Sequence, residues 1–384
     1  MSAGLFTPLT LRGVTLGNRV AISPMCQYSA ADGVANDWHF AHLARFALGG
    51  AGIVFVEATA VEARGRITPG DLGLWSDDQM PPLRRIARFL AAHGAVPAIQ
   101  LGHAGRKAAT QRPWHGNGPL DDGDRARGEV AWPVVAPSAL PVAPGWLMPA
   151  ALSQADMAGI AQAWRAATLR AAAAGFRIVE LHAAHGYLLH QFLSPLTNRR
   201  QDAYGGDLAG RMRFPLEMAE VVRAAWPADL PMFTRISAID DADDGWSLDD
   251  AAVFARELAA RGVDVVDCSS GGLAGSATAA RRVRWPGYQV PLATAIRQAA
   301  GLPVMAVGLI TDPGHAESIV RSEAADIVAI GREAMANPNW PLQARARLGD
   351  TGYAGWPMQA GWWLERRDRA RHEGWAAGVS ACKR

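Results

Sequence analysis

Short apolar runs and longer amphipathic or alanine-rich segments follow one another along the whole chain. Continuous apolar runs rich in β-branched residues are typical of parallel strands that are buried on both faces. Amphipathic segments after each run are typical of repeated strand–helix units. The pattern predicts eight strands, each followed by a helix, at residues 19–25, 52–61, 96–102, 176–185, 231–239, 263–271, 302–310 and 325–333.

Two of the predicted helices have clear start and stop signals. The segment 153–175 begins at Ser153, has Asp156 three positions later and ends at Gly175. A serine followed at this distance by an acidic residue resembles a capping box, and a glycine commonly ends a helix. The segment 247–262 repeats these signals, so both segments are expected to be crossover helices between parallel strands.

Eight strand–helix units predict an α/β fold, a (β/α)₈ TIM barrel that forms a single domain over residues 1–350. An open doubly wound sheet is the alternative. The segment 104–150 separates the third strand from its helix and holds seven of the 24 prolines. Long loops are uncommon unless they are functional, so we expect an insertion that acts as a lid or rim over the barrel; a packed flap without a role in the chemistry is equally compatible. Residues 351–384 form a C-terminal tail.

Composition and charge narrow the class of protein. The chain is 49% hydrophobic and 19% charged with a net charge of +2, which is typical of a globular protein and argues against nucleic-acid or membrane-surface binding. A small molecule is the expected partner. The three cysteines fit neither a disulfide framework nor a zinc site. No signal peptide or transmembrane segment is recognisable, so we expect a cytoplasmic protein.

Barrel enzymes build their sites from the carboxyl ends of the strands, and several of these ends carry suggestive residues. Gly308 and Gly331 with Arg332 end the last two strands, and this combination matches a frequent phosphate site of such barrels. Glycines that only relieve tight turns are the alternative. Arg235 lies in an apolar strand, where a buried cation requires either a salt-bridge partner or an anionic ligand.

The end of the fourth strand reads "HAAHGYLLH" and gathers His182, His185 and Tyr187. Two histidines at this spacing can bind a metal or act as neutral donors to a substrate oxygen. Because a catalytic zinc normally needs three protein ligands and no completing motif is nearby, the donor interpretation is favoured. A tyrosine is protonated at neutral pH and can donate a proton. His190, just beyond this cluster, is expected to be structural.

Two further expectations concern charged groups near this cluster. Lys107 follows the third strand, and a surface or rim contact is expected for it rather than a Schiff base. A metal-dependent barrel hydrolase or lyase that uses His182 and His185 with a carboxylate such as Glu180 or Asp267 remains the alternative hypothesis for the function.

Nine segments occur in the order in which they are found in one known family. They are "SPMCQYSA", "VEATAV", "GRITPGDLGLW", "HAGRKA", "GFRIVELHAAHGYLLHQFLSPLTNRRQDAYGGDLAGRMRF", "DCSSGG", "PGYQV", "AVGLITDP" and "IGRE". Over residues 5–345 the chain resembles the Old Yellow Enzyme family of FMN-dependent ene-reductases, specifically its thermophilic-like (class III) subgroup.

This resemblance implies tightly but non-covalently bound FMN, reduced by NADPH or NADH in a ping-pong cycle. It also implies that Cys26 lies beside the flavin and tunes its potential, and that Arg235 stabilises the reduced flavin. The cofactor contacts carried over by position are Ser23, Pro24, Met25, Cys26, Ala60, Gln100, Arg235, Gly308, Gly331 and Arg332.

The resemblance likewise implies the reduction of activated C=C bonds in α,β-unsaturated carbonyls, maleimides or nitroalkenes. His182 and His185 would bind the substrate oxygen, Tyr28 would face the substrate, and Tyr187 would protonate the carbon next to the one that receives hydride from flavin N5. In the tail, "AGWWLERR" resembles a segment that enters a neighbouring subunit's active site, with Trp363 as the best match. A homodimer or homotetramer is therefore expected. A flavin-binding barrel without turnover is a third hypothesis.

Overall fold

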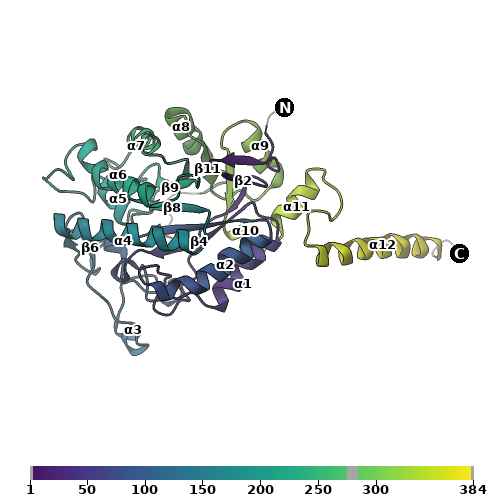
Figure 1. The fold of residues 1–384 in the computed structure, drawn as a ribbon, viewed down its shortest axis with the longest axis horizontal. Coiled ribbons are helices and arrows are strands. Elements are labelled where there is room, and N and C mark those ends of the chain that lie inside the picture. The colour runs from purple at the N-terminus through teal and green to yellow at the C-terminus, as the bar shows by residue number, and fades with distance from the viewer. Residues whose placement is uncertain (1–2, 275–283, 382–384) are drawn as a thin grey trace.

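A computed structural model describes residues 3–274 and 284–381, and its central feature is a closed barrel of parallel strands (Figure 1). Neighbouring strands follow the chain order, and β12 pairs with β3 to close the ring. Closure confirms the predicted (β/α)₈ barrel and excludes the open sheet. The barrel strands are β3 (Val20–Ile22), β4 (Ile53–Ala60), β5 (Val96–Gly102), β8 (Ile178–Ala183), β9 (Met232–Ser237), β10 (Val265–Ser269), β11 (Val304–Val307) and β12 (Ile327–Ile330).

Helices cover the outside of this barrel and connect its strands (Figure 1). The two helices with clear sequence signals start as predicted, since Ser153 and Ser247 both form capping boxes with an aspartate three residues later. The main outer helices are α1 (Asp37–Leu48), α2 (Met80–Ala92), α4 (Gln154–Ala173), α6 (Leu208–Ala225), α7 (Leu248–Ala260), α8 (Val290–Ala300), α9 (Pro313–Arg321) and α11 (Trp340–Arg347). Shorter helices are α5 (Leu188–Leu193) and α10 (Arg332–Ala336), with 3₁₀ turns at Ala63–Gly65, Asp77–Gln79, Gly105–Lys107 and Pro113–His115.

Several strands are shorter than the apolar runs that predicted them. The run 19–25 contains only the strand Val20–Ile22, and the run 302–310 contains Val304–Val307. After Ile22 the Ser23 N–H still donates to the Ile330 carbonyl at 3.0 Å, and the chain then leaves the sheet. Hydrophobicity marks burial and not pairing, so the buried residues that line the mouth of the barrel were included in the predicted strands.

An antiparallel hairpin of β1 (Leu9–Leu11) and β2 (Val14–Leu16) precedes the barrel. Arg12, in its turn, pairs with Asp264 at 2.6 Å and donates to the Ala228 carbonyl at 2.9 Å. Both partners lie just before barrel strands. The hairpin therefore covers the amino-terminal end of the barrel and leaves the carboxyl-terminal end for the site.

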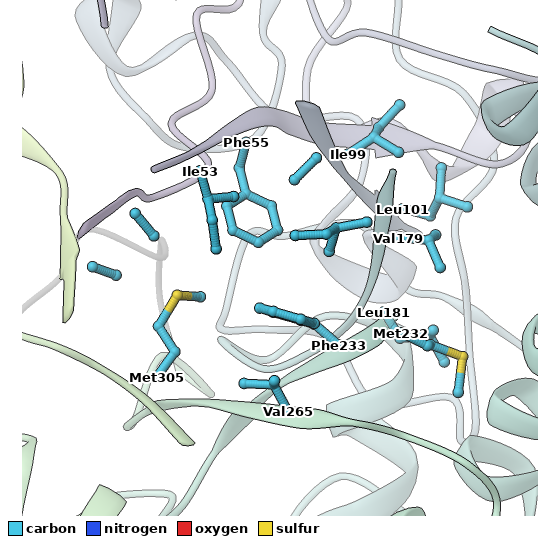
Figure 2. Packing of buried hydrophobic residues seen from close by; sticks show 14 of the residues in the cluster. Ile53, Phe55, Ile99, Leu101, Val179, Leu181, Met232, Phe233, Val265 and Met305 are labelled. Carbon is cyan, nitrogen blue, oxygen red and sulfur yellow. The ribbon is translucent and has the colours of Figure 1, made fainter. Parts of the chain in front are cut away.

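Apolar side chains fill the lower part of the barrel interior. Phe55, Phe233, Val265 and Met305 come from four different strands and point toward one another (Figure 2). The Phe55 and Phe233 rings are 6.0 Å apart. Because successive side chains of a strand alternate between its faces, the next inward positions of these strands lie one layer closer to the carboxyl-terminal mouth. This apolar layer is a dry floor beneath the polar groups described below.

The segment 104–150 is a long excursion with little regular structure, as its sequence predicts. It contains α3 (Asp122–Ala126) and the paired short strands β6 (Val135–Ala136) and β7 (Ala150–Ala151). Trp114 packs edge-on against Tyr28, with ring centroids 5.9 Å apart. Since Tyr28 follows the first barrel strand, the excursion reaches the rim of the barrel mouth.

The C-terminal tail forms α12 (Met358–Ala381), which extends away from the barrel (Figure 1). Trp363 on this helix is 67% exposed and stacks edge-on only against its neighbour Trp362 among the described ring contacts. Within residues 3–274 and 284–381, no helix combines the length and the apolar character needed to cross a bilayer.

Candidate active site

A cavity of about 320 Å³ opens at the carboxyl ends of the last barrel strands. Its walls include the predicted site residues His185, Arg235, Gly308, Gly331 and Arg332. These residues lie in or directly after four different strands, and His185 and Arg332 are 147 positions apart in the sequence. The closed barrel places all of them around one opening. The structure therefore confirms that they share a cavity, which the sequence could only infer from strand ends.

One end of this cavity is built from glycine backbone and arginine side chains. Gly308 has φ +131°, and a Cβ there would lie 3.0 Å from the Tyr288 ring. At Gly331 a Cβ would have room, since it would lie 3.6 Å from its closest neighbour, Met25 Sδ, but the backbone angles φ −108° and ψ −99° lie outside the usual regions for residues with a Cβ. Arg332 and Arg284 add cationic side chains to the same walls. Glycine backbone and two guanidinium groups at one end of a cavity suit a phosphate.

His182, His185 and Tyr187 converge at the end of β8. The His182 ring packs edge-on against His185 with centroids 5.2 Å apart and against Tyr187 at 4.9 Å. His182 Nδ1 accepts from the Ala184 N–H at 3.3 Å, which leaves Nε2 to carry the proton, and His185 Nε2 contacts Ser269 Oγ at 2.7 Å. Burial and the nearby Arg235 charge lower the pKa of both histidines. Both rings are therefore neutral, with one donor each.

Tyr187 is buried against the start of the 104–150 excursion. It belongs to a small apolar cluster with Ala104, Ala108, Ala109 and Val134. Burial raises the pKa of the Tyr187 phenol well above its ordinary value. The phenol is therefore protonated over the whole working pH range.

Lys107 contradicts the expectation of a surface or rim contact. Its side chain is 98% buried, and Nζ donates to the His185 carbonyl at 2.9 Å and to the Gly272 carbonyl at 2.6 Å. Nζ also lies 5.4 Å from the centre of the Tyr187 ring. Burial, aided by the Arg106 charge, lowers the pKa of Lys107 to about 7. The hydrogen bond from Lys107 Nζ to the His185 carbonyl stabilises the left-handed backbone conformation of His185, which has φ +58°.

His190 lies behind the cluster, as expected for a structural residue. Its Nδ1 accepts from the Gly186 N–H at 2.8 Å, and its Nε2 donates to Asp240 at 2.7 Å. Asp240 is held in turn by Ser194 Oγ at 2.6 Å and by the Trp246 N–H at 2.7 Å. This buried network fixes the turn between His185 and Tyr187.

Arg235 has the ion-pair partner that one of the two interpretations requires, since its Nε lies 3.2 Å from Asp267 Oδ2. The guanidinium also lines the cavity, and among the described residues Nε has no hydrogen-bond partner. The alternative, an anionic ligand for Arg235, stays a prediction. In the same layer of the barrel, Gln100 Nε2 donates to Glu180 Oε1 at 2.8 Å.

The residues after the first two strands surround the remaining side of the mouth. Ser23 is buried, and its Oγ has no hydrogen-bond partner in the described part of the chain. Pro24 and Met25 follow it, and burial together with Glu57 raises the pKa of the Cys26 thiol, which is therefore neutral. Ala60 lines a second, small cavity together with His182 and Tyr187. Trp363 lies on α12, outside both cavities of this subunit.

The metal hypothesis finds no support in the geometry of the histidine pair. Within the described residues, His182 and His185 do not join a carboxylate in a three-ligand group. A three-ligand group does occur in the 104–150 segment, and it consists of His115, Asp124 and Glu129. Both of its carboxylates already form ion pairs with arginines.

Sequence reasoning missed several residues that shape the cavity. Gln289 is buried, donates to the Val307 carbonyl at 3.0 Å and accepts from Ser270 Oγ at 2.9 Å. Arg284 and Tyr288 line the same walls. The motif "PGYQV" carried the signal for Tyr288 and Gln289, but they precede a helix, where attention to strand ends does not find them.

FMN fits this set of residues. The cavity volume lies within the range of cofactor sites, one end offers phosphate donors, and the buried Ser23 Oγ and Arg235 Nε have no hydrogen-bond partner among the described residues. The polar ring of an isoalloxazine can supply acceptors for such donors.

Comparisons with known proteins agree with this geometry. The NADH:flavin oxidoreductase / NADH oxidase family, whose cofactor is FMN, matches residues 4–351. NADPH dehydrogenase of Geobacillus sp. (strain WCH70) is 43% identical over 365 residues, which cover 94% of this chain and 99% of the relative. NADPH dehydrogenase of Listeria monocytogenes serotype 4a (strain HCC23) is 43% identical over 349 residues, 90% of this chain and 96% of the relative.

A solved structure of morphinone reductase superposes with a TM-score of 0.74 at 28% identity and covers 91% of both chains. These matches confirm the resemblance to the Old Yellow Enzymes and the expected FMN and nicotinamide donor. The chain is therefore an FMN-dependent oxidoreductase that belongs to the NADH:flavin oxidoreductase / NADH oxidase family.

Proposed function

We propose that this enzyme uses NADPH or NADH to reduce the activated C=C bond of α,β-unsaturated carbonyls, maleimides or nitroalkenes. The observation that carries the proposal is the convergence of His182, His185 and Tyr187 beside the cavity that fits FMN. Bound FMN supplies the hydride at its N5 atom. The residues of this chain bind and polarise the substrate and provide the proton.

The two histidines bind the oxygen of the activating carbonyl or nitro group. Both are neutral, so each offers an N–H donor without adding a charge. A hydrogen bond to this oxygen draws electron density from the alkene and makes its β-carbon electrophilic. His185 Nε2 contacts Ser269 Oγ, and a substrate oxygen would compete with that hydroxyl.

Tyr187 supplies the proton for the α-carbon. Its phenol lies next to His182 and keeps its proton because burial raises its pKa. Tyr28 and Trp114 stand at the rim and face the substrate from the side of the excursion. The 104–150 segment would thereby act as a rim that shapes access.

The remaining predicted residues would hold FMN. Gly308, Gly331 and Arg332 would bind the phosphate, and the residues Ser23, Pro24, Met25, Cys26, Ala60 and Gln100 would surround the ring. Arg235 would place a positive charge where negative charge develops on the reduced ring. Cys26 would approach the ring as a neutral thiol.

The test is a two-stage anaerobic experiment on the purified flavoprotein. NADPH should bleach the flavin absorbance, and 2-cyclohexenone or maleimide should then restore it. A flavin that NADPH reduces but that only oxygen, and no activated alkene, reoxidises would refute ene-reductase activity and indicate an NADPH oxidase. A flavin that NADPH does not reduce would indicate binding without turnover.

The C-terminal segment 351–384 would contact a neighbouring subunit in a homodimer or homotetramer. The projecting α12 and the exposed Trp363 support this proposal. Trp363→Ala should lower the assembly state or raise the KM for the alkene without changing flavin reduction by NADPH. A monomeric wild-type enzyme in analytical ultracentrifugation would refute it. A cytoplasmic location also remains a proposal, supported by the unpaired thiols of Cys26 and Cys268.

A further inference from the structure

Two carboxyl groups lie inside the barrel without a role in the proposed chemistry. Glu180 on β8 and Asp267 on β10 are both fully buried. The strand between them, β9, carries Arg235, which pairs in register with Asp267 on one side and with His182 on the other. The two carboxyls therefore lie on the strands to either side of Arg235, the residue that we propose to face the FMN ring.

Hydrogen-bond donors for these carboxyls are too few. Glu180 Oε1 accepts from Gln100 at 2.8 Å, but within residues 3–274 and 284–381 no donor reaches Glu180 Oε2 or either Asp267 oxygen. Asp267 has only the ion pair with Arg235 at 3.2 Å. The charges of the two carboxyl groups also act on each other across β9. Since an ionised carboxylate has no proton to donate, a hydrogen bond between them would require one of the two groups to be protonated.

The surroundings make full ionisation of the pair unfavourable. Phe233 pairs in register with Glu180, and Val265 lies two positions before Asp267 on β10, so the apolar floor (Figure 2) borders both carboxyls and offers no donor. Burial raises the pKa of both carboxyls, repulsion from Asp267 adds to the rise for Glu180, and Arg235 opposes it. Two like charges in contact with one cation commonly retain one proton between them.

We propose that Glu180 and Asp267 share a single proton and so present one negative charge to Arg235. The single negative charge of the pair neutralises Arg235 in the resting enzyme. If both carboxyls were ionised, their two negative charges would disfavour the anionic reduced flavin. If neither were ionised, Arg235 would be a buried cation without a compensating charge. The effect on the flavin rests on the proposed contact of Arg235 with FMN, whereas the shared proton does not.

The test compares Glu180→Gln, Asp267→Asn and the double variant as FMN-loaded proteins. Each amide is isosteric and can donate to the remaining carboxylate, which favours retention of the fold. In each single variant the remaining carboxyl should ionise, keep the net charge of the cluster and leave the flavin midpoint potential close to wild type. The double variant removes the negative charge of the pair, so the protein should bind reduced FMN at least about tenfold more tightly relative to oxidised FMN. This change corresponds to a flavin midpoint potential about 30 mV more positive. Asp249→Asn, the same change on the exposed face of α7, should leave the potential unchanged.

Infrared difference spectra supply the second measurement. Wild type minus either single variant should show the carbonyl stretch of a protonated carboxylic acid, because the single variants lose the shared proton. The difference is required because burial also raises the pKa of Glu57, which contributes its own band to every variant.

Three outcomes would overturn the inference or a part of it. Single variants that each raise the potential would show that both carboxylates are ionised. A band that persists in the single variants would show that both are protonated. The expected infrared pattern with an unchanged potential in the double variant would overturn the placement of FMN beside Arg235 and leave the shared proton standing.

Discussion

The replacement Lys107→Met tests how the buried lysine supports the site. Lys107 is almost completely buried, has two carbonyl partners and has no carboxylate among its hydrogen-bond partners. Burial lowers its pKa from the ordinary value of 10.5 to about 7. With about 1.4 kcal/mol for each pKa unit, the charged lysine costs the folded state on the order of 5 kcal/mol below pH 7. Methionine removes that cost but leaves two buried carbonyls without a donor, at about 1–3 kcal/mol each.

The sign of the pH dependence follows from the lowered pKa. Between about pH 7 and about pH 10 the unfolded chain keeps the Lys107 proton while the folded chain releases it, so the wild-type free energy of unfolding rises with pH. The free energy of unfolding of wild type, relative to that of Lys107→Met, should rise by about 1.4 kcal/mol per pH unit. The rise should reach about 3 kcal/mol between about pH 7.5 and about pH 9.5. At about pH 7 the removed cost of about 5 kcal/mol and the added cost of about 2–6 kcal/mol largely offset each other, so the variant should be about as stable as wild type.

Urea unfolding followed by tryptophan fluorescence, at equal free FMN and several pH values, measures this difference. Arg125→Met is the matched control, because it removes an exposed cation from α3, and its difference from wild type should not change with pH. A Lys107→Met difference that stays constant from about pH 7.5 to about pH 9.5 would refute the reasoning. Loss of the anchor on His185 should also raise the KM for the alkene while flavin reduction is retained.

Three further predictions concern the site. Tyr187→Phe should slow alkene reduction by about 100- to 10,000-fold and leave flavin reduction by NADPH nearly intact; equal losses in both half-reactions, measured by stopped flow, would contradict the proton-donor role. Because burial raises the pKa of Tyr187, the alkene step should not decline between about pH 8 and about pH 9.5; a decline that Tyr187→Phe abolishes would contradict this. Gly308→Ala forces alanine to φ +131° against Tyr288 and should weaken FMN binding by about tenfold, measured by the fluorescence of released FMN; unchanged FMN affinity would contradict the placement of the phosphate at Gly308.

Local signals were sufficient for the order and type of the elements. The capping boxes of Ser153 and Ser247 act within four residues, and buried parallel strands appear as apolar runs wherever they occur. The cluster of His182, His185 and Tyr187 spans six positions at one strand end, so its proximity could also be predicted. Strand boundaries were less accurate, because hydrophobicity does not separate a paired residue from one that is merely buried.

Lys107 and Gln289 show what local signals do not contain. The partners of Lys107 are carbonyls of residues 185 and 272, so its burial depends on segments that lie far away in the sequence. Gln289 bonds to the end of β11 from the start of α8. Lys107 lies five residues beyond the end of β5 and Gln289 directly precedes α8, so the residues at the strand ends do not include either of them.

The sequence by itself determined the residue types and their order along the chain, including eight apolar runs with polar groups at their ends. Only the tertiary structure decided which of those groups meet. Glu180 and Asp267 lie on strands that do not pair with each other but both flank β9, and the closed barrel directs both side chains into one buried interior. Ring closure is a long-range property of all eight strands, whereas caps and periodicity act over a few residues. The charge beside Arg235 is therefore set by the closed barrel and not by any motif.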